Sequence, residues 1–496
     1  MMIEALGVGL LLLILCITLL VTLVIWGKRH SSGILPPGPT PLPLLGNALQ
    51  LDFKCLIKEF KKISSRYGPV SMVYLGPKPV VILNGYEAVR EAFVENWDVF
   101  GDRGILALGE EIFKGHGVLF SNGERWKQIR RFSLSTLRNF GMGKRSLEEQ
   151  VLEEARCLGE EFQKNKDVPF DPAYLLNLAV SNVICSIVFG ERFDYDDDNF
   201  LSLLALLRES FQILTSPWGQ AYGVFPSLFK HLPGSHNKLF RNFKKLREFV
   251  MEKVKAHEES FDVNCPRDYI DCFLIKMSEE KDNPNTEFNY ENLFATLIHL
   301  FFGGTETSAT TIKYGILILL RFPHIAKRVQ EEIDHVVGQS RCPSMEDRNK
   351  MPYTDAVIHE IQRFADIVPL GLPRSTTKDI ILRGYLIPKG TSVFPMLTTA
   401  LKDPKFFKNP EEFDPNHFFD DSGSIKKNDA FIPFSIGKRV CLGESLARME
   451  IFLFITSILQ KFNLQSQLST EEIDISPLRT SAANFPRTYT FFVVQR

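Results

Sequence analysis

The most apolar part of the chain lies at its amino-terminal end. Residues 5–26 form 22 consecutive positions without a charged side chain. A helix of this length, at about 1.5 Å per residue, crosses the roughly 30 Å hydrocarbon core of a bilayer. Glu4 precedes the run, and Lys28, Arg29 and His30 follow it. Because basic flanks stay in the cytoplasm, the pattern predicts a signal-anchor helix with the rest of the chain in the cytosol.

The next segment, residues 31–47, is rich in proline. Proline fixes φ and lacks an N–H donor, so this density predicts a stiff, extended strut. We therefore divide the chain into a transmembrane helix with its basic flank at 1–30, the strut at 31–47 and a main domain at 48–496. A buried core helix is the alternative for the first segment, although such helices are rarely so long and so uniformly apolar.

Most of the main domain shows helical periodicity, for example over residues 148–163 and 237–259. Two β-rich runs, Val70–Leu75 and 79–83, flank Gly76-Pro77-Lys78 and predict a hairpin. Glycine and proline delimit further short strands at residues 379–382, 385–387 and 391–394. The pattern predicts a mainly α fold with a small β lobe behind a single N-terminal transmembrane helix.

One predicted helix, residues 289–321, conflicts with its own composition. It would be about 50 Å long, yet its middle, residues 303–311, reads GGTETSATT. Glycine and threonine are poor helix formers, and such local conflict tends to mark a functional site. Gly303 and Gly304 would let a flat ligand approach the backbone, and threonine hydroxyls can bond the preceding turn and bend the helix. A packing notch against another helix is the alternative.

Composition narrows the possible classes of function. Lys plus Arg total 58 against 59 Asp plus Glu, so no overall positive charge attracts nucleic acid. The 41 phenylalanines suit a large apolar interior. No CxxC pair is present, which argues against zinc ribbons and thioredoxin-like redox sites.

Cys441 occupies a loop, residues 434–444 (FSIGKRVCLGE), directly before a helix predicted over 445–460. Backbone N–H groups and the positive end of the helix dipole stabilise a thiolate in such a position. The thiolate is the form that binds a soft metal. Gly437 and Gly443 would let the loop wrap around a flat cofactor, and Arg439 is placed to meet an anionic group on it.

The spacing FxxGxRxCxG, filled here by Phe434, Gly437, Arg439, Cys441 and Gly443, resembles the haem-thiolate signature of the cytochromes P450. The resemblance implies the family's fold and a haem b cofactor whose iron is bound by the Cys441 thiolate. A cysteine thiolate is the axial ligand in this family. The other four residues would contact the cofactor.

Two further motifs that resemble the family's concern structure. Glu360-Ile361-Gln362-Arg363 matches ExxR, which implies a buried ion pair that braces the core. The partner motif PxRF is Pro415–Phe418 here, with His417 in place of the arginine. Whether the third member of this network carries a permanent charge is therefore left open.

Other motifs concern the cofactor and oxygen. Trp126 and Arg130 match the WxxxR element, which implies contacts to a haem propionate. Arg103 and Arg374 would be further propionate contacts. Residues 303–308 resemble the oxygen-activation segment, with Thr307 as the catalytic hydroxyl and Glu306 as the acid that feeds a proton relay.

The resemblance covers almost the whole chain and is strongest to the vertebrate microsomal second family, which oxidises drugs and fatty acids. It implies an endoplasmic reticulum protein that uses dioxygen to hydroxylate or epoxidise lipophilic substrates such as arachidonate, steroids and xenobiotics. Since the chain lacks a convincing dinucleotide motif, NADPH electrons would come from NADPH–cytochrome P450 reductase, with cytochrome b5 as a possible second donor. A plausible docking patch comprises Arg125, Lys127, Arg131 and Lys438.

The resemblance also places an apolar set of residues near the substrate. This set is Ile105, Phe113, Phe120, Phe301, Gly303, Val368, Leu372 and Ala482. Nothing in the sequence clearly supplies a charge that would fix one end of a ligand, so fatty acids, steroids and xenobiotics all stay open as substrates. Two other functions stay open: a haem-thiolate isomerase acting on a lipid peroxide without a reductase, and a non-catalytic haem sensor or carrier.

Overall fold

A computed structural model describes residues 34–496 apart from 105, 142–144, 167 and 481–482. The predicted transmembrane helix lies outside the described residues. Within residues 34–496 and apart from those gaps, no helix is both long enough and apolar enough to cross a membrane.

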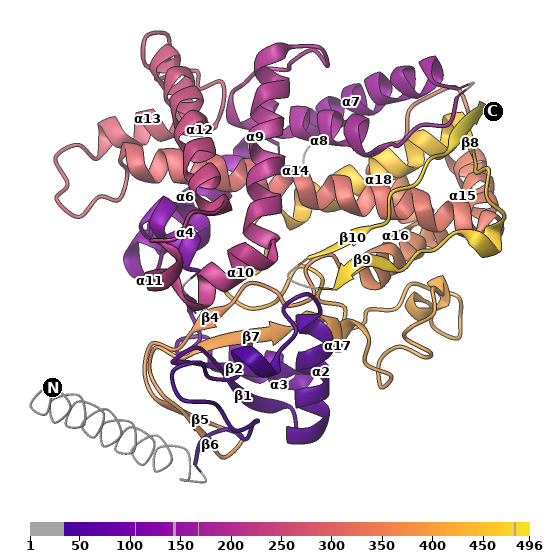
Figure 1. The fold of residues 1–496 in the computed structure, drawn as a ribbon. Coiled ribbons are helices and arrows are strands. Elements are labelled where there is room, and N and C mark those ends of the chain that lie inside the picture. Colours follow the sequence, from indigo (N-terminus) through magenta and orange to yellow (C-terminus); the bar gives the residue numbers. More distant parts are fainter. Residues whose placement is uncertain (1–33, 105, 142–144, 167, 481–482) are drawn as a thin grey trace, which may run out of the picture.

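Helices make up most of the described chain (Figure 1). The α-helices are α2 Leu56–Tyr67, α3 Tyr86–Arg90, α4 Ala107–Phe113, α5 Gly117–Phe120, α6 Gly123–Asn139, α7 Arg145–Lys164, α8 Ala173–Val188, α9 Asp198–Thr215, α10 Pro217–Val224, α11 Pro226–Phe229, α12 Ser235–Glu258, α13 Tyr269–Glu279, α14 Tyr290–Arg321, α15 Pro323–Val336, α16 Pro352–Ala365, α17 Leu397–Leu401 and α18 Glu444–Lys461.

The strands are short, and most of them gather in one lobe. They are β1 Val70–Leu75, β2 Lys78–Asn84, β3 Asp102–Arg103, β4 Arg374–Ser375, β5 Ile380–Leu382, β6 Tyr385–Ile387, β7 Ser392–Met396, β8 Phe462–Gln465, β9 Pro477–Thr480, β10 Asn484–Pro486 and β11 Phe492–Gln495. The largest sheet has five strands in the order β1-β2-β7-β4-β3. The β2–β7 pair is parallel, with Val80 opposite Ser392, whereas β1–β2 and β3–β4 are antiparallel.

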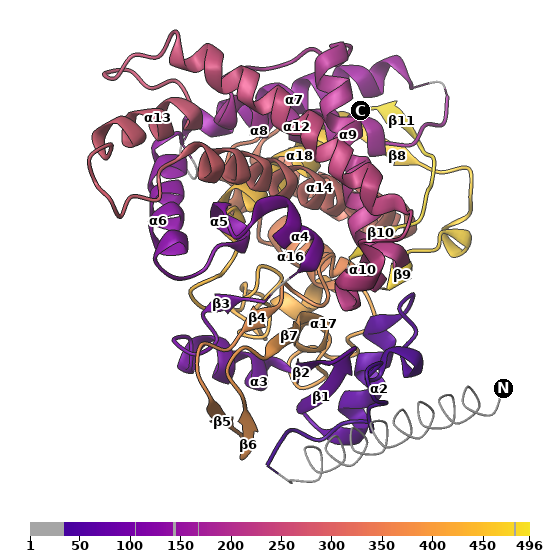
Figure 2. The same ribbon diagram turned by 60° about the vertical axis from the view of Figure 1, so that its left-hand side comes forward.

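The molecule has a helical body on one side and the β lobe on the other (Figures 1 and 2). Helix α14 runs through the body and packs against α8, α5, α18 and α16. The side chain of Asn289 caps its start by accepting the backbone N–H of Asn292. Helix α14 therefore forms over almost the range predicted from the sequence and stays helical through its glycine pair.

The predicted mainly α fold with a small β lobe is confirmed. The hairpin lies at β1–β2, and the three later strands lie at β5, β6 and β7. The described part of the proline-rich segment lies along β1, because the Pro37 carbonyl accepts the Met72 N–H at 2.9 Å. The domain boundaries at 30 and 47 stay a prediction.

Candidate active site

The loop that carries Cys441 adopts a backbone conformation that requires glycine at position 437. Gly437 has a φ of +78°, and a Cβ at this position would lie 2.1 Å from the Phe93 carbonyl oxygen. The Cys441 N–H donates to the Phe434 carbonyl at 3.0 Å. Arg130, on α6, donates from Nη2 to the Val440 carbonyl at 2.6 Å. The sulfur is therefore held by a loop fixed on both sides, just before α18 begins.

The surroundings of Cys441 act on its thiol in opposite directions. Burial raises the pKa of the thiol, while the hydrogen bond from the Gly443 N–H and the charge of Arg130 lower it. The net shift is upward. The predicted stabilisation by backbone N–H groups is present, but it does not outweigh burial. A bound metal cation deprotonates a coordinating thiol outright, so the iron itself would generate the thiolate.

Four arginines predicted to contact the cofactor come together. Arg103 and Arg374 lie directly opposite each other in the β3–β4 pair. Arg439 stacks on the Trp126 ring at 4.2 Å, and Arg130 lies 5.7 Å from the same ring. Like charges directly opposite in a sheet are destabilising. These four arginines therefore cluster positive charge that does not stabilise the folded protein by itself.

The electrostatics of this group call for an anion. Burial and the charge of Arg439 lower the pKa of Arg374 to about 9. Burial and the charge of Arg103 lower the pKa of Arg439 to about 9, although Asp102 offsets part of this effect. Burial also lowers the pKa of Arg103. Among the described residues, Arg374 Nε and Arg439 Nη1 are buried without a hydrogen-bond partner. Such unpaired donors are costly unless a ligand satisfies them.

Two glycines border open space in this region. A Cβ built at Gly303 on α14, or at Gly443 before α18, would meet no described atom within 4 Å. A flat group can therefore approach both backbones. Together with the thiol and the unpaired arginine N–H groups, the residues fit a planar, anionic cofactor that carries iron. Cys441 would hold the metal, and Arg103, Trp126, Arg130, Arg374 and Arg439 would hold the carboxylates.

The predicted ExxR pair is fully buried. Arg363 donates to Glu360 from Nε at 2.6 Å and from Nη2 at 2.7 Å, and both side chains are 0% exposed. Arg363 also donates to three backbone carbonyls, those of Leu401, Pro410 and Glu412. These bonds tie α16 to the chain that precedes the cysteine loop.

His417 takes the place of the family arginine. Its Nδ1 lies 3.1 Å from Glu360 Oε1, and its Nε2 contacts the Lys408 carbonyl. Both partners accept, so both ring nitrogens donate and the ring is the imidazolium. Burial lowers the pKa of His417, but the hydrogen bond and charge of Glu360 outweigh burial and raise it. The third member of the network is therefore a titratable cation.

The network should make stability depend on pH. Because folding raises the pKa of His417, its contribution is fully present below its unfolded value of about 6.5 and is lost as pH rises through the folded value. We expect wild type to lose stability relative to His417→Arg as pH rises from about 6.5 through the raised folded pKa of His417. Thermal unfolding of both proteins across this range checks the difference. An equal pH dependence of the two proteins would show that His417 is not charged.

The segment of α14 that resembles the oxygen-activation motif contains hydrogen-bonded threonines and a glycine packed against α8. The Thr307 hydroxyl donates to the Gly303 carbonyl at 2.6 Å, and Thr311 donates to the Thr307 carbonyl at 2.8 Å. The predicted bonding of the threonines to the preceding turn is thus present. The prediction for Gly304 was wrong. A Cβ there would lie 2.2 Å from Ile184 Cδ1, so this glycine admits α8 rather than a ligand.

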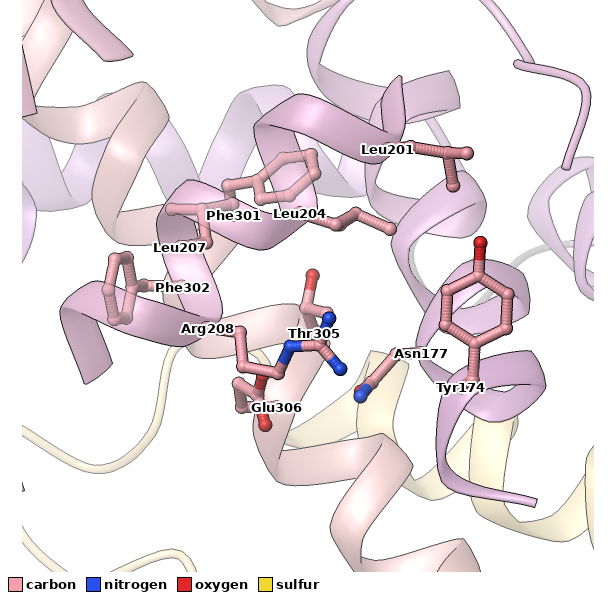
Figure 3. Close-up of a pocket in the computed structure, with 10 residues that line it drawn as sticks. All are labelled: Tyr174, Asn177, Leu201, Leu204, Leu207, Arg208, Phe301, Phe302, Thr305 and Glu306. Carbon is pink, nitrogen blue, oxygen red and sulfur yellow. The ribbon is translucent and has the colours of Figure 1, made fainter. Parts of the chain in front are cut away.

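Glu306 lines a cavity of about 200 Å³ between α8, α9 and α14 (Figure 3). Burial raises the pKa of Glu306, and the charge of Arg208 offsets part of the shift. The residues around the cavity are Tyr174, Asn177, Leu201, Leu204, Leu207, Arg208, Phe301, Phe302, Thr305 and Glu306.

Most residues that line this cavity were not predicted from the sequence. Leu201, Leu204 and Arg208 share one stripe of α9 at helical spacing, and an arginine on an otherwise apolar stripe is the signal that could have revealed it. The sequence analysis expected no charge that would fix one end of a ligand, whereas Arg208 and Glu306 both line this cavity.

The predicted substrate residues meet only in part. Phe113 and Phe120 stack at 5.6 Å, and His299 of α14 lies against both rings. Phe301 lines the cavity but also contacts Phe189. Val368 and Leu372 are half-buried in the loop between α16 and β4. Ile105 and Ala482 lie outside the described residues.

His299 is a further residue that the motifs did not indicate. Its Nδ1 accepts the Leu119 N–H at 3.3 Å. Burial and the charge of Arg103 lower its pKa to about 3, so the ring is neutral. It holds α5 against α14.

The predicted docking residues are partly committed elsewhere. Arg125 pairs with Glu287 at 2.7 Å, and Lys127 pairs with Glu124 at 2.6 Å. Lys438 is exposed and lies 5.2 Å from the Trp97 ring. Arg131 is exposed.

Comparison with known proteins supports the same assignment. The sequence model of the cytochrome P450 family matches residues 36–491. The chain is 53% identical to cytochrome P450 2C8 of Homo sapiens, over 96% of this chain and 97% of that protein. It is 54% identical to cytochrome P450 2A5 of Mus musculus, over 97% of each chain. The chain therefore belongs to the cytochrome P450 family, as a haem-thiolate monooxygenase that oxidises lipophilic substrates.

Proposed function

We propose that this chain is a single-pass monooxygenase of the endoplasmic reticulum membrane, with residues 48–496 as the haem-binding catalytic domain on the cytosolic side. It takes NADPH electrons from NADPH–cytochrome P450 reductase and hydroxylates or epoxidises fatty acids, steroids or xenobiotics. The observation that carries the proposal is the cradle of buried arginines with unpaired N–H groups beside Cys441. When bound, the haem supplies the redox chemistry that activates dioxygen.

Thr307 and Glu306 would manage protons in this reaction. Since the Thr307 hydroxyl donates to the Gly303 carbonyl, its lone pairs remain to accept a hydrogen bond. Glu306 is the next residue and lines the cavity. Its raised pKa lets it hold a proton closer to neutral pH than an exposed glutamate. The two residues can therefore pass protons from the cavity toward the face of α14 that carries Gly303.

Exposed apolar side chains support the membrane location. Ile34, Leu44 and Leu49 are 56%, 71% and 74% exposed and follow the predicted anchor in the sequence. Apolar side chains this exposed are suited to a lipid surface. For electron entry, the proposed docking patch for the reductase comprises Arg125, Lys127, Arg131 and Lys438, and cytochrome b5 is the proposed second donor.

Two other functions make different demands on the site. An isomerase acting on a lipid peroxide needs neither a reductase nor a proton relay, and a haem carrier needs no oxygen-activation segment. The presence of Thr307 beside a buried acid favours the monooxygenase. Purified holoenzyme with reductase is incubated with a fatty acid and, separately, with a fatty-acid hydroperoxide, each with and without NADPH. Oxidation of the fatty acid only with NADPH supports the proposal, whereas NADPH-independent conversion of the hydroperoxide with no oxidation of the fatty acid would identify the isomerase.

Replacing Thr307 by alanine tests the relay separately. We expect NADPH oxidation to continue while hydrogen peroxide rises and product falls by about 10-fold or more, since general acid–base catalysis contributes typically about 10²–10⁴-fold. The ratio of product to NADPH consumed is the measurement. Thr310→Ala, on the same helix, is the control. An unchanged ratio in Thr307→Ala would remove Thr307 from the relay.

A further inference from the structure

We infer that Arg208 binds the carboxylate of a fatty-acid substrate, so that the acid lies with its head in the cavity between α8, α9 and α14 and its chain toward Gly303 and Thr307. The inference rests on the proposed function, because it names the substrate class and the anchoring residue of that same site.

The first argument is that the Arg208 guanidinium is free to bind a ligand. Arg208 is exposed and lines the cavity, its charge acts on Glu306, and no hydrogen bond or ion pair of its side chain is found in the described part of the chain. Figure 3 shows its guanidinium directed into the cavity, between Thr305 and Asn177. Asn177 Oδ1 is buried there and also has no hydrogen-bond partner among the described residues. A guanidinium presents paired N–H donors whose geometry matches a carboxylate.

The second argument is that the rest of the cavity suits an alkyl chain. Leu204, Leu207 and Phe302 form much of its wall. Glu306 is the acidic neighbour on α14; burial raises its pKa, and the charge of Arg208 offsets part of this shift. The cavity therefore joins one cation, one acid, polar groups and an apolar wall.

The third argument concerns size and direction. A cavity of about 200 Å³ is smaller than the roughly 300–1,000 Å³ that encloses a drug-sized ligand. It suits one end of a long molecule. On α14, Phe302 and Glu306 face the cavity one turn apart, and Gly303 and Thr307 form the neighbouring row. A chain that leaves the cavity along this helix reaches the open space beside Gly303.

Equilibrium binding tests the anchor without turnover. Isothermal titration calorimetry of the holoenzyme compares palmitate with methyl palmitate, which lacks the charge. We expect wild type to bind the acid about tenfold more tightly than the ester. Arg208→Gln should reduce this preference to about onefold, and Arg208→Lys should restore part of it. Arg241→Gln, an exposed arginine of α12, should keep the preference. An unchanged preference in Arg208→Gln would overturn the inference.

The position of the oxidised carbon shows whether the substrate carboxylate is bound by Arg208 during the reaction or the acid binds elsewhere on the protein. Palmitate, stearate and arachidate are oxidised in turn with reductase and NADPH. If Arg208 holds the carboxylate, the oxidised carbon keeps a constant distance from the carboxyl end, and Arg208→Gln spreads the products. A constant distance from the methyl end would overturn the inference. Oxidation of methyl palmitate by wild type shows in the same experiment that the proposed monooxygenase activity is present.

Discussion

Cys441→Ser abolishes both the strongly red-shifted Soret band of the ferrous–CO complex and monooxygenase turnover. Serine keeps the loop geometry, in which the residue 441 N–H donates to the Phe434 carbonyl. It cannot supply the thiolate whose electron density shifts the band and promotes O–O cleavage. The measurement is the CO difference spectrum, normalised to the haem bound.

The matched control is Cys342→Ser, which changes an exposed free cysteine far along the chain. It should keep the red-shifted band. A red-shifted band that survived in Cys441→Ser would mean that another sulfur is the ligand.

Arg363→Met should prevent recovery of folded holoenzyme. The side chain is 0% exposed, binds Glu360 through two hydrogen bonds and donates to three carbonyls. Removing one partner of a buried pair typically costs about 3–5 kcal/mol, because the other charge is left unpaired. This is a large part of the roughly 5–15 kcal/mol that stabilises a folded protein. Haem bound per mole of purified protein, together with thermal unfolding, measures the loss.

An exposed copy of the same pair provides the control. Glu153 and Arg156 on α7 have the same residue types and the same spacing, but Arg156 is 49% exposed. Arg156→Met should cost no more than about 1 kcal/mol. If the two variants lost equal stability, burial of the ExxR pair would not be what makes it important.

Local chemistry was predictable from the sequence, whereas convergence of distant segments was not. Three features depend only on residues close together in the sequence: the cysteine loop, the ExxR pair and the hairpin. The structure has each of them at the predicted position. Nothing in β2 indicates that its parallel partner is β7, far along the chain. Gly304 was misread for the same reason, since its neighbour Ile184 lies on another helix.

The candidate site shows the same division. The arginines proposed to contact the propionates could be named from family spacing, but the unpaired N–H groups of Arg374 and Arg439 became visible only when β4 and the cysteine loop came together. Arg208 belongs to no motif. Its importance depends on α8, α9 and α14 meeting around one cavity, which no stretch of sequence encodes alone.

The order of strands in the main sheet has a consequence for synthesis on the ribosome. Strand β2 needs β7 as its neighbour, and β3 needs β4, so the sheet joins residues 70–103 to residues 374–396. At about 5–20 residues per second, roughly 15–60 s pass between the emergence of the two groups. During this interval the hairpin presents an unpaired edge, which is a template for pairing with other chains. Slower translation through the helical body should therefore lower the yield of folded enzyme, and a chaperone that shields this edge should restore it.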